Sequence, residues 1–181
     1  TLALARPPCG NRLAILSNGG GTGVMATDAL IDAGGELAVL SNETVSRLND
    51  VLPPTWSHAN PIDIIGDATA ERYAAALEVI LKERNADGIL VLNCPTALTS
   101  SDEVARAVVE ILPERPAKTV LTSWIGEKEA KAPRNRLRKH GIPTYQTPED
   151  AVQAFMQMVD FRRNQTMLME TPPSLPELFR P

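Results

Sequence analysis

The chain has 181 residues, a formal net charge of −4 and a sequence pI near 5.2, with 43% hydrophobic and 22% charged residues. This length favours one hydrophobic core, and this composition is that of an ordinary globular protein rather than a disordered one. The acidic balance supplies no basic field for nucleic acid or an anionic membrane, and no apolar run approaches the roughly 20 residues that cross a bilayer. We therefore expect a cytoplasmic protein that binds neither nucleic acid nor membrane, with any phosphate site confined to a local feature.

Proline residues gather at both ends of the chain, with Pro7 and Pro8 near the start and four more between residues 172 and 181. We predict an N-terminal linker over residues 1–10, one domain over residues 11–163 and a Pro-rich C-terminal linker over residues 164–181, as in a domain taken from a larger protein. The two cysteines, Cys9 and Cys94, lie in different sequence settings, so no disulfide is expected.

Strand and helix patterns alternate along the chain. Four nearly continuous apolar runs predict strands buried on both faces, and a weaker fifth follows them; the runs cover residues 13–16, 37–40, 88–92, 119–122 and 143–145. Apolar residues at helical spacing predict helices over residues 25–33, 73–81, 104–112 and 151–159. The last helix follows Thr147 as an N-cap and Pro148 in its first turn. The pattern predicts a flavodoxin-like, doubly wound parallel sheet of about five strands in a three-layer α/β/α fold.

A glycine-rich turn follows the first predicted strand over residues 17–23, with the sequence Ser-Asn-Gly-Gly-Gly-Thr-Gly. Glycines let backbone amides approach and point at one anion, and the positive end of the next helix adds to the attraction. Residues 21–26 also fit the G-x-G-x-x-A dinucleotide pattern, but Ser41 and Asn42 stand where a ribose-binding acid is expected. No lysine follows the glycines, which excludes a P-loop for ATP. The turn predicts a phosphate or carboxylate site, and tight helix packing is the alternative reason for its glycines.

A second informative stretch is the long polar connection over residues 56–69. Long connections in compact domains are often functional, and loops carry function more often than cores do. Asn60 and Pro61 form a common turn pair, and Asp67 or Thr69 is a candidate N-cap for the following helix. A binding role and a purely structural role both remain open for this stretch.

A third turn, over residues 93–99, follows the central strand and opens another helix, which one of the hydroxyl residues 99–101 caps. In a parallel sheet this turn lies beside the glycine turn, at the edge where ligands collect. Cys94 could be imagined as a nucleophile, but no residue identifies itself as its base, and free cysteines are commonly buried packing groups. We predict packing as the role of the Cys94 thiol.

Two other features predict less. His58 and His140 are the only histidines and no paired cysteine spacing occurs, so no metal site is expected. A basic run surrounds Pro133, which should start or break a helix, and we interpret this run as a solvated face. Its members are Lys128, Lys131, Arg134, Arg136, Arg138 and Lys139.

Residues 13–24 and 60–69 together resemble the CoA-ligase (succinyl-CoA synthetase-like) domain of the NDP-forming acyl-CoA synthetases, over about residues 11–163. The specific segment is Asn-Pro-Ile-Asp-Ile-Ile-Gly-Asp-Ala-Thr, and Thr22 stands where the family often has proline. Such enzymes interconvert an acyl-CoA, ADP and phosphate with a free acid, CoA and ATP, through an acyl phosphate and a phosphohistidine. The phosphohistidine belongs to a neighbouring domain with a Ser-His-Thr-Gly-Ser type motif, which is absent here, so His58 is not given that role.

The resemblance implies a domain without catalytic residues, inactive alone, that contributes helix N-termini and the glycine turn to a phosphate or acyl-CoA site. For the parent enzyme it implies CoA or acyl-CoA and ADP/ATP with magnesium as cofactors, and for this domain a phosphate-type anion. The implied partners are CoA-binding, phosphohistidine and ATP-grasp domains of the same protein or complex; a homo-oligomer is left open. The implied site comprises Asn18, Gly19, Gly20, Gly21, Thr22, Gly23, Asn60, Pro61, Asp63, Gly66, Asp67, Cys94, Pro95, Thr96 and Ala97.

Two alternatives remain open from the sequence. Residues 52–58 also resemble bacterial protein lysine acetyltransferases, in which the synthetase-like region is a regulatory, acyl-CoA-sensing module fused to an acetyltransferase domain. The pattern over residues 21–26 leaves a dinucleotide-binding oxidoreductase domain as the other alternative, and micromolar NAD(H) binding would favour it.

Overall fold

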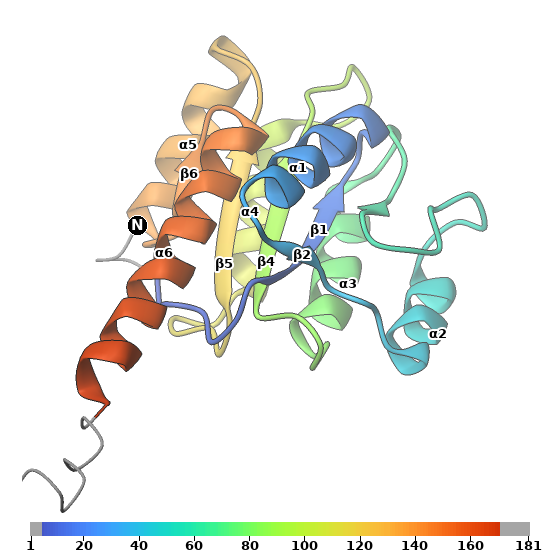
Figure 1. Cartoon of the computed structure of the whole chain (residues 1–181). Helices are drawn as coiled ribbons and strands as arrows, with labels where there is room; N and C mark the ends of the chain where they lie inside the picture. Colours follow the sequence, from blue (N-terminus) through green and yellow to red (C-terminus); the bar gives the residue numbers. More distant parts are fainter. Residues whose placement is uncertain (1–4, 171–181) are drawn as a thin grey trace, which may run out of the picture.

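A parallel β-sheet with helices on both faces organises the chain (Figure 1). The computed structural model describes residues 5–170, so the prolines of the predicted C-terminal linker lie outside the described residues. The strands run in the spatial order β2-β1-β4-β5-β6, and β3 pairs with the end of β1. Their bounds are β1 (Arg12–Ser17), β2 (Glu36–Leu37), β3 (Ile62–Asp63), β4 (Gly88–Asn93), β5 (Thr119–Trp124) and β6 (Thr144–Tyr145). The predicted doubly wound α/β fold is confirmed, with one short strand more than expected.

The helices form the two outer layers. One face of the sheet is covered by α1 (Gly20–Asp32) and α6 (Pro148–Met169), and the other by α2 (Asn42–Val51), α3 (Ala70–Leu81), α4 (Ser101–Ile111) and α5 (Lys128–Lys139). Alternate residues of each central strand enter the two cores: Leu13 and Ile15 of β1 pack under α1 and α6, whereas Ala14 and Leu16 pack under α3. Burial on both faces explains why β1 and β4 are nearly continuous in apolar character, whereas β5 buries Thr119, Thr122 and Ser123 among its apolar residues.

Several boundaries differ from the sequence expectations. The strand expected over residues 37–40 is paired only at Glu36 and Leu37. Helix α2 was not predicted, because only Thr44 and Leu48 on it are buried and its apolar stripe is short. Helix α6 continues to Met169, so residues 164–169 of the predicted linker are helical.

Pro133 corrects another expectation, since it lies inside α5 rather than starting or breaking it. A proline there removes the hydrogen bond that would reach the carbonyl of Glu129. Glu129 is exposed in the first turn of α5, so water can satisfy that carbonyl, while the Pro133 ring is buried against the core. The helix therefore tolerates the ring.

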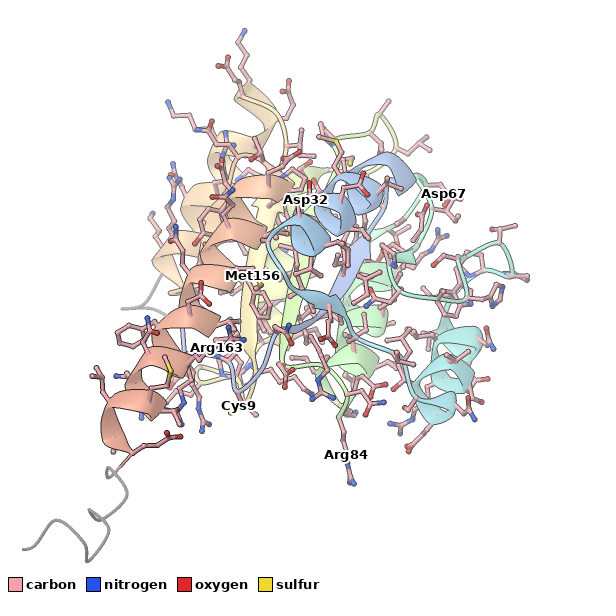
Figure 2. All side chains as sticks on the ribbon, in the orientation of Figure 1. Cys9, Asp32, Asp67, Arg84, Met156 and Arg163 are labelled. Atoms are coloured by element: carbon pink, nitrogen blue, oxygen red, sulfur yellow. The ribbon has the colours of Figure 1, made fainter. Side chains whose placement is uncertain are left out.

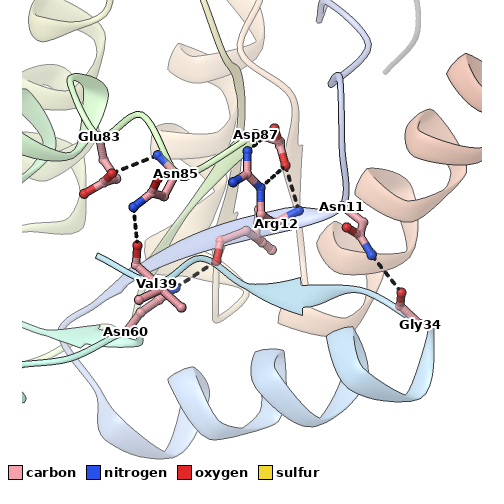
Figure 3. Close-up of polar contacts among 9 residues, drawn as sticks. Asn11, Arg12, Gly34, Val39, Asn60, Glu83, Asn85 and Asp87 are labelled. Atoms are coloured by element: carbon pink, nitrogen blue, oxygen red, sulfur yellow. Dashed lines mark hydrogen bonds and ion pairs between the residues drawn. The ribbon is translucent and has the colours of Figure 1, made fainter. Parts of the chain in front are cut away.

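Polar contacts fasten the amino edge of the sheet, where the strands begin (Figure 3). The Asp87 carboxylate accepts hydrogen bonds from Arg12 Nε at 2.8 Å, Arg12 Nη2 at 3.0 Å and the Arg12 main-chain N–H at 3.1 Å. Asn85 donates to the carbonyl of Val39, and Asn11 donates to that of Gly34. These contacts join the loops before β1 and β4 to the β2 region. Within residues 5–170, no helix combines the length and apolar character that a membrane span requires.

Candidate functional site

Three loops meet at the carboxyl edge of the sheet, where β1, β3 and β4 end. The side chain of Asn18, after β1, pairs with the main chain of Cys94, after β4: the Cys94 N–H donates to Asn18 Oδ1 at 2.8 Å, and Asn18 Nδ2 donates to the Cys94 carbonyl at 2.9 Å. Asn18 is only 4% exposed and Cys94 is half-buried, so the paired groups are partly shielded from water. The structure thus brings together the first and third turns predicted from the sequence.

A contact between Gly19 and Cys94 brings the same two loops still closer. A Cβ atom at Gly19 would lie 2.8 Å from Cys94 Sγ, so any larger residue there would displace the thiol. Thr22 Oγ1 lies 3.1 Å from Cys94 Sγ, donates to the Gly19 carbonyl at 2.7 Å and is 2.9 Å from Ser17 Oγ. Burial raises the pKa of the Cys94 thiol, opposed by its hydrogen bond with Thr22, so the thiol stays protonated at neutral pH.

The second predicted stretch reaches the start of α1. A Cβ at Gly20 would lie 3.0 Å from Asp63 Oδ2, and one at Gly23 would lie 3.2 Å from the Pro61 ring, so both residues pack against this helix. The other carboxylate oxygen, Asp63 Oδ1, accepts the Ile65 N–H at 2.9 Å. Gly66 lies close to the Asn18 carbonyl: a Cβ added at Gly66 would be 3.7 Å from that oxygen.

The amides that could hold an anion are the unpaired ones at this edge. Helix α1 begins at Gly20, and its first intrahelical bond runs from the Gly23 N–H to the Gly19 carbonyl. The N–H groups of residues 20–22 therefore have no acceptor within the helix, and they point outward with the positive end of its dipole. The adjacent Asp63 carboxylate opposes an external anion there. In the loop after β4, the amides of residues 96–98 donate to no other group within residues 5–170, and α4 begins only at Ser101.

Two buried polar side chains under these loops, Tyr73 and Asn93, were not among the site residues predicted from the sequence. The Tyr73 hydroxyl donates to the Leu92 carbonyl at 2.8 Å, and Asn93 Nδ2 lies 3.4 Å from that hydroxyl oxygen. Complete burial raises the pKa of Tyr73, so the phenol remains a neutral donor. Asn93 Oδ1 is buried and has no partner among the described residues. A buried acceptor of this kind leaves a place for the N–H or O–H of a water or ligand.

Arg134 corrects the interpretation of the basic run as a solvated face. Its side chain is 7% exposed and donates to the carbonyl of Trp124 at 3.1 Å and that of Gly126 at 2.9 Å. Gly126 in turn lies against the Pro95 ring: a Cβ added at Gly126 would be 3.7 Å from Pro95 Cγ. Arg134 therefore holds the loop after β5 beside the loop after β4. Arg136 pairs with Asp102 of α4 at 2.7 Å. The four lysine and arginine residues that remain are exposed, as predicted.

Two predicted site residues use their side chains within the fold. Asn60 accepts the Ile15 N–H at 2.9 Å and donates to the carbonyls of Leu13 and Ala38, which ties β1 to the segment after β2. Asp67 forms an ion pair with Arg72, and Thr69, the other candidate cap, is the residue whose hydroxyl caps α3. The sequence pattern identified these residues as important but did not separate a structural role from a binding one.

The donor set of the carboxyl edge fits a phosphate-type anion better than a metal ion. Backbone N–H groups at a helix start and in a glycine-rich loop bind anions without needing a charged side chain. Within residues 5–170, no three His, Cys, Asp or Glu side chains gather so as to hold a metal ion.

The chain is similar to a known domain family and to several known proteins. A family model described as the Ligase-CoA domain matches residues 13–168. The chain is 37% identical over 142 residues to "Acetate--CoA ligase [ADP-forming] I" of Archaeoglobus fulgidus, covering 78% of this chain and 20% of that protein. It is 38% identical over 154 residues to "Acetate--CoA ligase [ADP-forming]" of Methanocaldococcus jannaschii, covering 83% and 22%.

A solved structure, the dinucleotide forming acetyl-coenzyme A synthetase 1 of Ca. Korarchaeum cryptofilum in complex with phosphate and ADP, superposes with a TM-score of 0.86 at 32% identity. The superposition covers 96% of this chain and 38% of that one. The chain thus spans between a fifth and about two fifths of the length of these proteins. The family match covers most of the chain and both identities exceed 30%. The chain belongs to the Ligase-CoA domain family of ADP-forming acyl-CoA synthetases.

Proposed function

We propose that this chain is the CoA-ligase domain of an enzyme that converts an acyl-CoA, ADP and phosphate into a free acid, CoA and ATP. In that role the carboxyl edge binds the phosphate-type anion, either a phosphoryl group or a substrate carboxylate. The observation that carries the proposal is the Asn18–Cys94 pairing, because it joins the two loops that lead to the unpaired amides, in a chain of this family.

The chemistry required of this domain is electrostatic. Amides of residues 20–22 and 96–98 would donate to the anion's oxygens, and their positions are set before binding, so little reorganisation accompanies charge transfer. Cys94 and Tyr73 both remain protonated at neutral pH. In this proposal they act as neutral groups that hold the loops in place, and not as a base or a nucleophile. The Asp63 carboxylate, next to Gly20, limits how strongly the site holds a bare anion.

The other parts of the reaction belong, in this proposal, to other domains of the parent enzyme. CoA-binding and ATP-grasp domains would hold CoA or acyl-CoA and ADP/ATP with magnesium. A separate domain would carry the phosphohistidine. The whole enzyme would act in the cytoplasm. The chain alone should then form no ATP from acetyl-CoA, ADP and phosphate. Production of ATP by the purified chain would contradict this division of labour.

Phosphate titration followed by 1H–15N NMR tests the anion site directly. Phosphate should shift the amide signals of residues 20–22 and 96–98, and Asp63→Asn should strengthen binding by about three- to tenfold by removing a like charge next to the site. Asp32→Asn is the matched control, because it removes an exposed carboxylate at the far end of α1 and should leave binding unchanged. Absence of saturable shifts in both the wild type and Asp63→Asn would overturn the anion site.

A parallel titration with NAD(H) tests the remaining oxidoreductase alternative. Micromolar binding centred on residues 21–26 would favour a dinucleotide site over the proposal made here. The proposal predicts no saturable binding, because no acidic residue stands between Leu37 and Asn42 to receive a ribose.

A further inference from the structure

A cavity of about 480 Å³ lies at the amino edge of the sheet, opposite to the anion site. Its walls are the ends of α4 and α5, the residues that lead into β5 and β6, and the segment Ala5–Arg6. We call it the amino-edge cavity. Its volume falls within the range of pockets that bind small molecules.

The floor of the amino-edge cavity is apolar. It is formed by Val109 and Leu112 of the α4 end, Val120 of β5, and Ile142 and Pro143 before β6. Val120 and Ile142 are 5% and 8% exposed, so they belong to the edge of the main core. An aliphatic or aromatic group placed here would gain burial against side chains that the fold already holds in position.

The rim of the cavity is positively charged. Arg6, Arg115 and Lys118 line it together with a single carboxylate, Glu114, and with His140. The rim therefore carries three basic side chains against one carboxylate, and none of the three forms a direct ion pair with another described residue.

Lys118 is the most confined of these cations. Its Nζ donates to the Leu81 carbonyl at 2.8 Å, and burial lowers the pKa of Lys118, against the attraction of Glu83 and Asp87. Asp87 is already bonded to Arg12, and Glu83 to main-chain amides. A half-buried ammonium with one carbonyl acceptor gains more from an added anion than a hydrated one does.

The end of α5 does not cancel this positive rim. Its last carbonyls are bonded, with the His140 N–H donating to Arg136, Gly141 to Arg138 and Ile142 to Leu137. Gly141 adopts a φ of 72°, as the residue after a helix commonly does. Because these carbonyls already have donors, they present little free negative charge to the cavity.

We propose that the amino-edge cavity binds a small amphipathic carboxylate, with its apolar body on the Val120 and Ile142 floor and its carboxylate at the Arg115 and Lys118 rim. The Thr119 hydroxyl donates to the Arg6 carbonyl and so fixes the segment before β1, which forms one side of the site. This proposal is independent of the function proposed for the carboxyl edge.

Hexanoate is the probe for this site, measured by ligand-observed NMR and calorimetry on the full chain. Acetate retains the charge without the apolar body, and hexanamide retains the body without the charge. Hexanoate should bind saturably and about tenfold or more tightly than either, since each loses one of the two interactions. Equal affinity for the three, or no saturable hexanoate binding, overturns the proposal.

Two variants locate the binding. Ala117→Trp adds a bulky side chain at the exposed lip of the cavity and should abolish hexanoate binding while leaving the phosphate titration of the carboxyl edge unchanged. Arg115→Gln should weaken binding by about three- to fivefold. The matched control is Arg84→Gln, because Arg84 is an exposed arginine at the same edge but outside the cavity (Figure 2). Persistence of binding in Ala117→Trp, or an equal loss in Arg84→Gln, contradicts the location.

Discussion

The side-chain amide of Asn18 pairs with the main chain of Cys94 as a neighbouring strand would. Asn18 Nδ2 donates to the Cys94 carbonyl at 2.9 Å, and Asn18 Oδ1 accepts from the Cys94 N–H at 2.8 Å. The two residues are 76 positions apart in sequence, yet this pair sets the distance between the first and third loops of the carboxyl edge. Any anion that contacts both loops depends on it.

Replacing Asn18 by alanine should therefore lower stability and anion binding together. Both Cys94 main-chain groups lose their partner in a partly buried setting, so the free energy of unfolding should fall by about 2–4 kcal/mol. Urea unfolding measures this change. Asn85→Ala is the matched control, because its side chain also donates to a backbone carbonyl, that of Val39, but at an exposed position; it should cost under about 1 kcal/mol. Equal losses in the two variants would show that the Asn18 pairing is not special.

Two neighbouring glycines should respond in opposite directions to alanine. Gly19→Ala places a Cβ 2.8 Å from Cys94 Sγ, so the thiol must turn away from Thr22, and the protein should lose about 1–3 kcal/mol. Gly21→Ala meets nothing within 4 Å in the first turn of α1 and should gain about 0.5–1 kcal/mol. Thermal and urea unfolding check both. Combining Cys94→Ala with Gly19→Ala should restore most of the stability that Gly19→Ala loses. If it does not, the contact between the Cβ added at Gly19 and Cys94 Sγ is not the cause of the loss.

The two cysteines should differ in reactivity. Cys9 is exposed at the amino edge (Figure 2), whereas Cys94 is half-buried with its thiol pKa raised by burial. Because the thiolate is the reacting form, a disulfide reagent at pH 8 should modify Cys9 at least about tenfold faster than Cys94. The rates are read from the Cys9→Ser and Cys94→Ser variants. Comparable rates would contradict the packing role of Cys94.

The Arg12–Asp87 pair should make stability depend on acid pH. The side-chain hydrogen bond from Arg12 lowers the pKa of Asp87 below its ordinary value of about 3.9, against the opposing effect of burial. A lowered folded-state pKa means that the unfolded chain binds the proton more tightly. The stabilisation is therefore complete at neutral pH and is lost as pH falls through the folded-state pKa, below about pH 4.

Urea unfolding between pH 7 and pH 3 checks this dependence. The curves of wild type and Asp87→Asn should approach each other at the acid end, with the wild type more stable at neutral pH. Glu78→Gln is the control: Glu78 forms an exposed pair with Lys82 one turn away, so its removal should change the slope little. Parallel curves for wild type and Asp87→Asn would contradict the linkage.

Much of the fold was readable from local patterns. Continuous apolar runs such as Leu13–Leu16 marked buried strands, because a strand covered by helices on both faces has no polar side. The capping residues Thr69 and Thr147 were also readable, since a cap bonds an amide only three residues away. Short elements were not predicted. Strand β3 has only two residues and pairs with the distant β1, so no hydrophobic periodicity in its own sequence indicates it.

The residues themselves determined that this chain would form a doubly wound sheet with a glycine-rich, amide-lined edge, because burial and backbone freedom are properties of each residue type. Only the tertiary structure decided how the polar side chains are used. It pairs Asn18 with Cys94, turns Asn60 back onto β1 and buries Arg134 under the loop after β5. Hydrogen-bond partners are selected by which loops the sheet order brings together, and that order is a property of the whole chain.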